Sequence, residues 1–128
     1  MASATAELTM TATPDAVWAV VRDYHGLAGW MPGIDESVAE GDDRVLSMMG
    51  MSVRERLVKL DDEHRALTYT IVEGAPVESH QATLTVSADG AGSKVVWDVT
   101  VTPDEMAPMF EQIYAQALVP LKAKAEEG

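Results

Sequence analysis

The chain contains no cysteine, and this absence excludes disulfide bonds, thiolate nucleophiles and thiolate metal ligands. Its three histidines lie far apart in the sequence, and no His-Glu-x-x-His pattern or other closely spaced ligand set is present. The chain also lacks a glycine-rich phosphate loop and a Gly-x-Ser-x-Gly nucleophile elbow. We therefore expect no metal, no cofactor and no Ser-His-Asp triad.

Basic residues are scarce: 9 lysines and arginines stand against 21 acidic residues, which gives a formal net charge of -12. Nucleic acids and anionic membrane surfaces carry the same sign and would repel such a protein. No apolar run is long enough to span a bilayer, and residues 1–7 have neither the basic segment nor the apolar run of a secretory leader. We therefore expect a cytoplasmic protein that binds no nucleic acid and does not insert into membranes.

The composition fits an ordinary globular protein, because 47% of its 128 residues are hydrophobic. This length suits one domain over residues 1–128. Apolar and polar residues alternate over 4–12, which predicts a half-buried strand. A helix over 14–24 is expected next, with Thr13 as its N-cap and Pro14 at its first position. Residues 25–34 are expected to form a loop or a second short helix.

Strand-like segments separated by short turns fill most of the remaining chain, which predicts antiparallel pairing. They lie near 36–40, 44–49, 51–60, 66–73, 79–88 and 94–102. A long helix is expected over 103–126, where apolar residues recur at helical spacing and where Thr102 and Glu105 fit a capping box. The order of elements predicts an α+β fold.

Two groups of residues resemble a known family. Val17-Trp18, Asp23-Tyr24 and Trp30-Met31-Pro32 resemble the first helix and following turn of the START-like (SRPBCC) superfamily. Glu55-Arg56-Leu57 and Leu67-Thr68-Tyr69 resemble its central hairpin, as in polyketide cyclase/dehydratase-like members. The resemblance implies the helix-grip fold: a curved antiparallel sheet of about seven strands wraps around a long C-terminal helix, with one or two short helices after the first strand. It also implies a ligand cavity between sheet and helix.

Strand phase indicates which polar side chains point inward. His80 shares a face with Ala82 and Leu84, so it is predicted to lie on the apolar side of its strand. The same argument turns Glu55 and Tyr69 inward. Folding the two turns places Glu55 opposite Ile71, and Ile71 opposite His80. Glu55 and His80 should then lie level, two strands and about 10 Å apart.

These inward polar residues have two interpretations. They either form hydrogen bonds within a structural core or line a ligand cavity. If the protein is catalytic, His80 is the expected proton carrier and Tyr69 the expected donor to an oxyanion, with Glu55 as the third candidate. Burial would lower the pKa of His80 and a nearby Glu55 carboxylate would raise it, so the direction stays open. The expected ligand-binding residues are Trp30, Met31, Met49, Met51, Trp97, Phe110 and Tyr114.

The superfamily contains polyketide cyclases, lipid-transfer domains and plant hormone receptors, so its fold does not define an activity. The first hypothesis is a domain that binds a small hydrophobic or amphipathic molecule, with or without cyclisation or dehydration of that molecule. The second is a non-catalytic carrier or sensor of a lipid or metabolite. The third is a subunit that uses the fold for protein contacts alone. A monomer and a homodimer are both compatible with the sequence.

Overall fold

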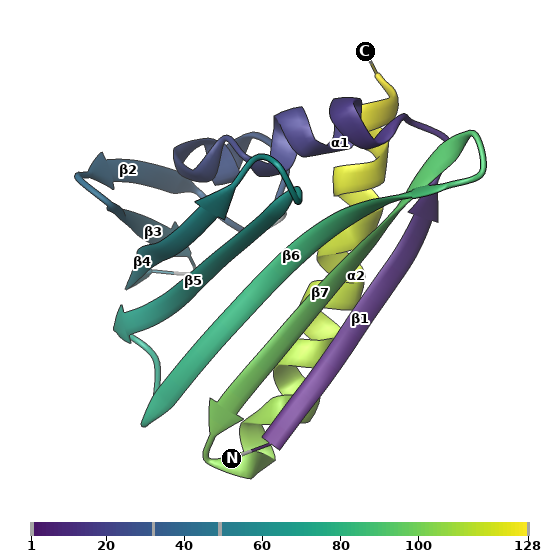
Figure 1. The fold of residues 1–128 in the computed structure, drawn as a ribbon. Helices are drawn as coiled ribbons and strands as arrows, with labels where there is room; N and C mark the ends of the chain where they lie inside the picture. Colours follow the sequence, from purple (N-terminus) through teal and green to yellow (C-terminus); the bar gives the residue numbers. More distant parts are fainter. Residues whose placement is uncertain (1, 32, 49, 128) are drawn as a thin grey trace.

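The computed structural model describes residues 2–31, 33–48 and 50–127. Seven described strands form one antiparallel sheet in the order β1-β7-β6-β5-β4-β3-β2. They are β1 (Ala2–Met10), β2 (Glu36–Glu40), β3 (Asp43–Met48), β4 (Met51–Asp61), β5 (Ala66–Glu73), β6 (Ser79–Asp89) and β7 (Gly92–Thr102). The sheet curves around the long helix α2 (Ala107–Glu126), as Figure 1 shows. The predicted α+β helix-grip fold is confirmed.

The first helix, α1 (Pro14–Val21), begins as its sequence predicts. The Thr13 hydroxyl accepts a hydrogen bond from the Ala16 amide at 3.2 Å. Val17, Trp18 and Val21 are buried, and the Trp18 indole donates to the Asp62 carboxylate at 2.8 Å. The short 3-10 helix η1 (Tyr24–Gly29) follows. The N-terminal helical segment is therefore tied to the sheet by apolar packing and by polar contacts, among them Trp18 to Asp62 and Arg65 to Asp15.

The expected capping box at the C-terminal helix is wrong. Thr102 is the last residue of β7, where it pairs with Ser79 and its carbonyl accepts from the Glu78 amide at 2.7 Å. Because strand pairing already occupies the Thr102 backbone, Thr102 does not form the capping box. The 3-10 turn η2 (Asp104–Met106) precedes α2 without a side-chain cap. The buried stripe of α2 consists of Ala107, Phe110, Tyr114, Ala117, Leu118, Leu121 and Ala125.

Irregular pairing between β4 and β5 explains a phase conflict in the sequence. Leu57 pairs with Tyr69 and Lys59 pairs with Thr68, so Val58 is an extra residue on β4. Val58 is 54% exposed. Leu57 and Leu60 both pack against the core, although strict alternation would place them on opposite faces of the strand. A bulge of this kind bends the strand, and here it adds to the curvature of the sheet.

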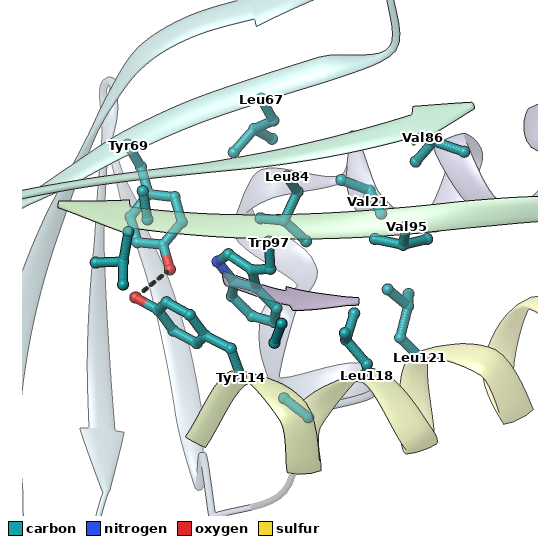
Figure 2. Packing of buried hydrophobic residues seen from close by; sticks show 14 of the residues in the cluster. Val21, Leu67, Tyr69, Leu84, Val86, Val95, Trp97, Tyr114, Leu118 and Leu121 are labelled. Atoms are coloured by element: carbon teal, nitrogen blue, oxygen red, sulfur yellow. Dashed lines mark hydrogen bonds between the residues drawn. The ribbon is translucent and has the colours of Figure 1, made fainter. Parts of the chain in front are cut away.

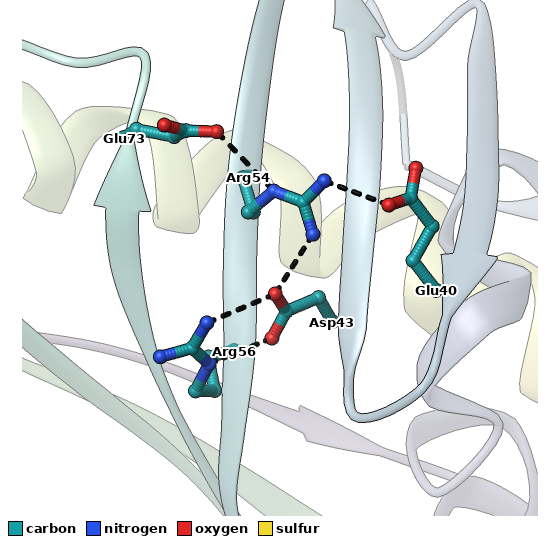
Figure 3. Close-up of polar contacts among 5 residues, drawn as sticks. All are labelled: Glu40, Asp43, Arg54, Arg56 and Glu73. Atoms are coloured by element: carbon teal, nitrogen blue, oxygen red, sulfur yellow. Dashed lines mark hydrogen bonds and ion pairs between the residues drawn. The ribbon is translucent and has the colours of Figure 1, made fainter.

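The outer face of β2–β5 carries an ion-pair network, shown in Figure 3. Asp43 accepts from Arg54 and Arg56 at 2.8 Å each, and Arg54 also contacts Glu40 at 2.7 Å and Glu73 at 3.2 Å. Hydrogen bonds from Arg56 and Arg54 lower the pKa of Asp43 to about 2. Because Arg54 and Arg56 take part in this outer network, the intervening Glu55 side chain points to the concave face, as the strand phase predicts.

Candidate functional site

A buried ion pair lies on the concave face of the β3–β4 hairpin. Arg44 on β3 stands opposite Glu55 on β4, and the two residues are only 4% and 7% exposed. The Arg44 Nε and Nη2 atoms each lie 2.8 Å from Glu55 Oε1, and Nη1 donates to the Tyr24 carbonyl at 2.8 Å. The interior therefore contains a cation and an anion that balance each other.

Two aromatic rings enclose the guanidinium group. Its central carbon lies 4.0 Å from the Tyr24 ring centroid and 4.9 Å from that of Tyr69, so the cation faces two π systems. Burial raises the pKa of Glu55, while the charge of Arg44 and its hydrogen bond oppose that shift. Glu55 Oε1 is thus held by Arg44, and the role of Glu55 in catalysis stays a prediction.

Arg44 was absent from the sequence-based site, although two signals pointed to it. It shares the strand phase of Leu46, which is 2% exposed. Folding the β3–β4 hairpin at Gly50 also pairs Arg44 with Glu55, as the observed register does. Because arginines usually face water, the sequence-based site did not include Arg44.

His80 lies where β5 and β6 stop pairing through their backbones. Their ladder ends at Tyr69 opposite Ala82. Beyond that point the Ile71 amide donates to His80 Nδ1 at 3.2 Å, and the Thr70 hydroxyl donates to the His80 carbonyl. The imidazole therefore takes the place of a ladder acceptor, and Ile71, which pairs with Glu55 on its other side, lies between Glu55 and His80 as predicted.

The imidazole continues a hydrogen-bonded chain into α2. His80 Nε2 lies 3.1 Å from the Tyr114 hydroxyl, which lies 3.1 Å from the Tyr69 hydroxyl (Figure 2 shows the tyrosine pair). Burial lowers the pKa of His80 to about 4 and raises the pKa values of Tyr69 and Tyr114. All three groups are therefore uncharged near neutral pH. Since Nδ1 accepts from Ile71, the imidazole proton is on Nε2 and is donated to Tyr114.

Aromatic rings surround this chain. Trp97 stacks on Tyr114 with ring centroids 4.1 Å apart and an interplanar angle of 3°, and Phe110 lies 5.0 Å from the His80 ring. Trp97 Nε1 is buried and faces the Tyr69 hydroxyl (Figure 2), and its weak hydrogen bond to that hydroxyl works against the raised pKa of Tyr69. The structure thus brings together five predicted site residues in what we call the aromatic cluster: Tyr69, His80, Trp97, Phe110 and Tyr114.

The other predicted ligand-binding residues lie around or outside this cluster. The Trp30 ring lies 6.2 Å from Trp97, and Met31 is half-buried against the core. Met51 is 56% exposed at the start of β4, and Met49 lies outside the described residues. The ligand-binding roles of these residues stay predictions.

The surface hollows in the described part of the chain include two that border α2. One of about 440 Å³ lies beside α1 and η1 and includes Trp30 and Lys124 in its wall. The other, of about 380 Å³, lies between the end of β1, the β6–β7 turn and Lys122. Neither of these two is lined by Glu55, Tyr69 or His80, so the internal ligand cavity also stays a prediction.

No group of three or more His, Asp or Glu residues in residues 2–31, 33–48 and 50–127 is arranged to hold a metal ion. Across the same ranges, no helix has both the length and the apolar character needed to cross a membrane.

A family model matches nearly the whole chain. Residues 1–126 match the model described as "Polyketide cyclase / dehydrase and lipid transport". The chain therefore belongs to this family, and its resemblance to the START-like superfamily is confirmed. A comparison with curated proteins found no match.

Solved structures of several bacterial proteins share the fold over nearly the whole chain. The protein XoxI from Bacillus cereus is 30% identical with a TM-score of 0.90, and the alignment covers 96% of this chain and 94% of XoxI. A protein from Bacillus thuringiensis is 26% identical with a TM-score of 0.87, covering 95% and 97% of the two chains. One from Thermobifida fusca is 28% identical with a TM-score of 0.81, covering 99% and 93%.

Removing the buried Arg44 cation should show how strongly the free energy of unfolding depends on the Arg44–Glu55 pair. Arg44→Met would leave the Glu55 carboxylate buried and unpaired, and we expect a loss of about 3–5 kcal/mol of unfolding free energy. The double variant Arg44→Met/Glu55→Leu should recover most of that loss, because both charges are gone. Urea unfolding of the three proteins measures these differences.

Arg22→Met is the matched control, since Arg22 pairs with Asp62 at 2.8 Å on the exposed surface. It should change stability much less than Arg44→Met. Equal losses for the two single variants would contradict a special role of the buried pair.

The low pKa of His80 should make stability depend on pH. The unfolded chain binds a proton near the ordinary pKa of 6.5, whereas the folded chain does so only near 4. Stability is therefore full above the unfolded value and is lost as the pH falls toward 4. Between pH 7 and pH 5 we expect a loss of at most about 2 kcal/mol from this group.

Urea unfolding at both pH values, with His80→Gln for comparison, isolates this contribution. Glutamine does not titrate, so the variant should show a smaller decrease in unfolding free energy between the two pH values. Parallel pH dependences of the two proteins would show that His80 does not carry the effect.

Proposed function

We propose that the protein binds a small hydrophobic or amphipathic organic molecule between the concave face of the sheet and α2. The observation that carries this proposal is the aromatic cluster, which sets polar atoms of Tyr69, His80, Trp97 and Tyr114 against the apolar core and beside the buried Arg44–Glu55 pair. An unsatisfied buried donor costs about 1–3 kcal/mol, which apolar side chains in its place would avoid. A ligand-binding site would explain why polar groups lie here, whereas a purely structural core would not need them.

The arrangement favours a carrier or sensor over a catalyst. Both imidazole nitrogens of His80 are engaged, by Ile71 and by Tyr114, and Glu55 is engaged by Arg44. A general base needs a free lone pair that reaches the substrate. The lipid-transport part of the family description agrees with a binding role.

A second candidate is cyclisation or dehydration of the bound molecule. The 3.1 Å contact between His80 Nε2 and the Tyr114 hydroxyl favours it, because the imidazole N–H would stabilise a phenolate formed when Tyr114 donates its proton. In this scheme the Tyr69 hydroxyl also supports the developing charge, since it lies 3.1 Å from Tyr114.

Binding is tested with ligand that co-purifies from the native host and with the neutral fluorescent probe N-phenyl-1-naphthylamine. Native mass spectrometry should find one small molecule on the protein, and the probe should bind saturably and be displaced by that molecule. His80→Gln should keep the fold and weaken binding of the co-purified molecule by about 5-fold, the effect of one neutral hydrogen bond. Thermal unfolding checks the fold of the variant.

His64→Gln is the matched control, because His64 lies in the exposed β4–β5 turn with 72% of its side chain accessible. It should leave affinity unchanged. A His80→Gln protein that melts earlier yet binds with unaltered affinity would identify His80 as a structural residue and remove it from the site.

The two candidate functions differ in what happens to that molecule. Incubated with a trace of protein, a carried ligand keeps its mass, whereas dehydration removes one water and cyclisation changes its retention on a column. We expect an unchanged ligand. Turnover that disappears in Tyr114→Phe and His80→Gln would instead support the catalytic candidate.

A further inference from the structure

The hollow beside α1 and η1 has an apolar wall and lies outside the aromatic cluster. Its volume is about 440 Å³, within the usual range of small-molecule pockets, and Val20 of α1 and the side chain of Trp30 line it. Trp30 also packs against the main core and against the smaller cluster of Leu27, Ile34 and Leu46. These contacts hold the indole in place, so the hollow presents a fixed apolar surface to a small molecule.

Lys124 on α2 brings a cation without a partner to this hollow. The chain has nine lysines and arginines, all within the described residues. Seven form ion pairs with carboxylates: Arg22, Arg44, Arg54, Arg56, Lys59, Arg65 and Lys94. Lys122 interacts electrostatically with Glu126. Across residues 2–31, 33–48 and 50–127, Lys124 alone among these cations lacks an ion pair, a hydrogen bond and an electrostatic partner.

Asp23 brings a carboxylate to the same hollow. Its side chain lies over Gly26, where an added β-carbon would be 2.3 Å from Asp23 Oδ2. Asp23 occupies the N-cap position of η1, yet its side chain forms no capping hydrogen bond. Arg22 acts on Asp23 electrostatically but gives its hydrogen bonds to Asp62. The Asp23 carboxylate therefore keeps its lone pairs for a donor inside the hollow.

The two charged groups restrict what the hollow can hold. A ligand with only a carboxylate would pair with Lys124 but would face the negative charge of Asp23, and a ligand with only an ammonium group would have the opposite conflict. A molecule that carries both groups has a partner for each of them. Such a molecule has no net charge, so the net charge of -12 on the protein does not repel it as it would an anion.

We propose that this hollow binds a small zwitterion with an apolar body, of the class of the apolar α-amino acids. Its carboxylate pairs with Lys124, its ammonium group pairs with Asp23, and its apolar body lies against Trp30 and Val20. The indole of Trp30 also attracts an ammonium group through its π face. The stem of Lys124 is flexible, so its charged end can follow the carboxylate. This site is separate from the interior site of the proposed function.

The test uses four probes that share a phenylethyl group. L-Phenylalanine carries both charges, 2-phenylethylamine only the ammonium group, 3-phenylpropionate only the carboxylate, and 3-phenylpropan-1-ol neither. Nuclear magnetic resonance titration of the isotope-labelled protein at neutral pH gives the four dissociation constants. Because partly exposed ion pairs contribute a few-fold each, we expect phenylalanine to bind at least about 3-fold more tightly than either singly charged probe and about 10-fold more tightly than the alcohol.

The same titration locates the probe. The signals of Gly26, Gly29 and the Trp30 indole should shift on addition of phenylalanine, because these residues line the hollow. Shifts confined to the aromatic cluster would place phenylalanine in the interior and would overturn the inference.

Two charge variants separate the two halves of the ligand. Lys124→Met should weaken phenylalanine binding by about 3-fold without weakening 2-phenylethylamine, and Asp23→Asn should weaken phenylalanine similarly without weakening 3-phenylpropionate. Lys122→Met and Asp89→Asn are the matched controls, because both residues line the other hollow. Both controls should bind phenylalanine as the unmodified protein does, and equal losses in variants and controls would identify a nonspecific charge effect and reject the site.

Gly26→Ala tests the position of the carboxylate without changing a charge. Gly26 has a φ of -90°, which alanine also adopts, but the new methyl group would displace the Asp23 side chain. The variant should fold, as thermal unfolding checks, and should lose as much affinity for phenylalanine as Asp23→Asn does. Full affinity in Gly26→Ala would show that the ligand does not use the observed Asp23 carboxylate.

The comparison of the four probes decides the charge requirement. Equal affinities of phenylalanine and the alcohol, or tightest binding of a singly charged probe, would overturn the zwitterion inference. Neither result bears on the proposed function, which depends on a co-purified molecule in the interior and on His80. Loss of interior binding would in turn leave phenylalanine binding at the outer hollow unaffected.

Discussion

The buried guanidinium of Arg44 determines how the half of the molecule that carries the site is assembled. It contacts Glu55 on β4, the carbonyl of Tyr24 in η1, and the ring faces of Tyr24 and Tyr69. A cation removed from water is tolerated only where anions, dipoles and π faces replace its hydration. Each of these partners is therefore constrained in position, and one of them, Tyr69, directs its hydroxyl toward α2.

A second constraint acts at the other edge of the site, where His80 takes the place of a backbone acceptor. Because the Ile71 amide donates to Nδ1, the imidazole is fixed in one tautomer and one orientation. Its remaining N–H then points to Tyr114 on α2. The break in β5–β6 pairing is thus coupled to the chemistry of the aromatic cluster, since the same residue completes the sheet and supplies a donor to the interior.

Sequence reasoning predicted the fold and part of the site because both depend on short-range periodicity. Strand phase alone turned Glu55, Tyr69 and His80 inward, and turn positions alone placed Glu55 opposite Ile71. The helix start at Thr13 was predicted for the same reason, whereas the similar signal at Thr102 failed because β6 pairing competes for that backbone. A local pattern predicts well only where no distant segment forms hydrogen bonds with the same backbone atoms.

The remaining features depend on distances between residues that are remote in sequence. Arg44 was missed because burial of an arginine becomes acceptable only once Glu55, Tyr24 and Tyr69 surround it. Strand phase points Arg44 inward, but only these distant partners make its burial favourable. The contact of the Trp97 N–H with the Tyr69 hydroxyl is likewise set by tertiary packing, since the two residues lie on different strands.

The hydrogen bonds within the cluster also bear on the choice between carrier and catalyst. The Tyr69–Tyr114 and His80–Tyr114 bonds join the sheet to α2, and breaking them would loosen the packing of the helix on the sheet. Proton transfer by His80 would require one of its two hydrogen bonds to break, because both ring nitrogens are occupied. The arrangement that holds the helix in place therefore favours recognition of a ligand over its chemical conversion.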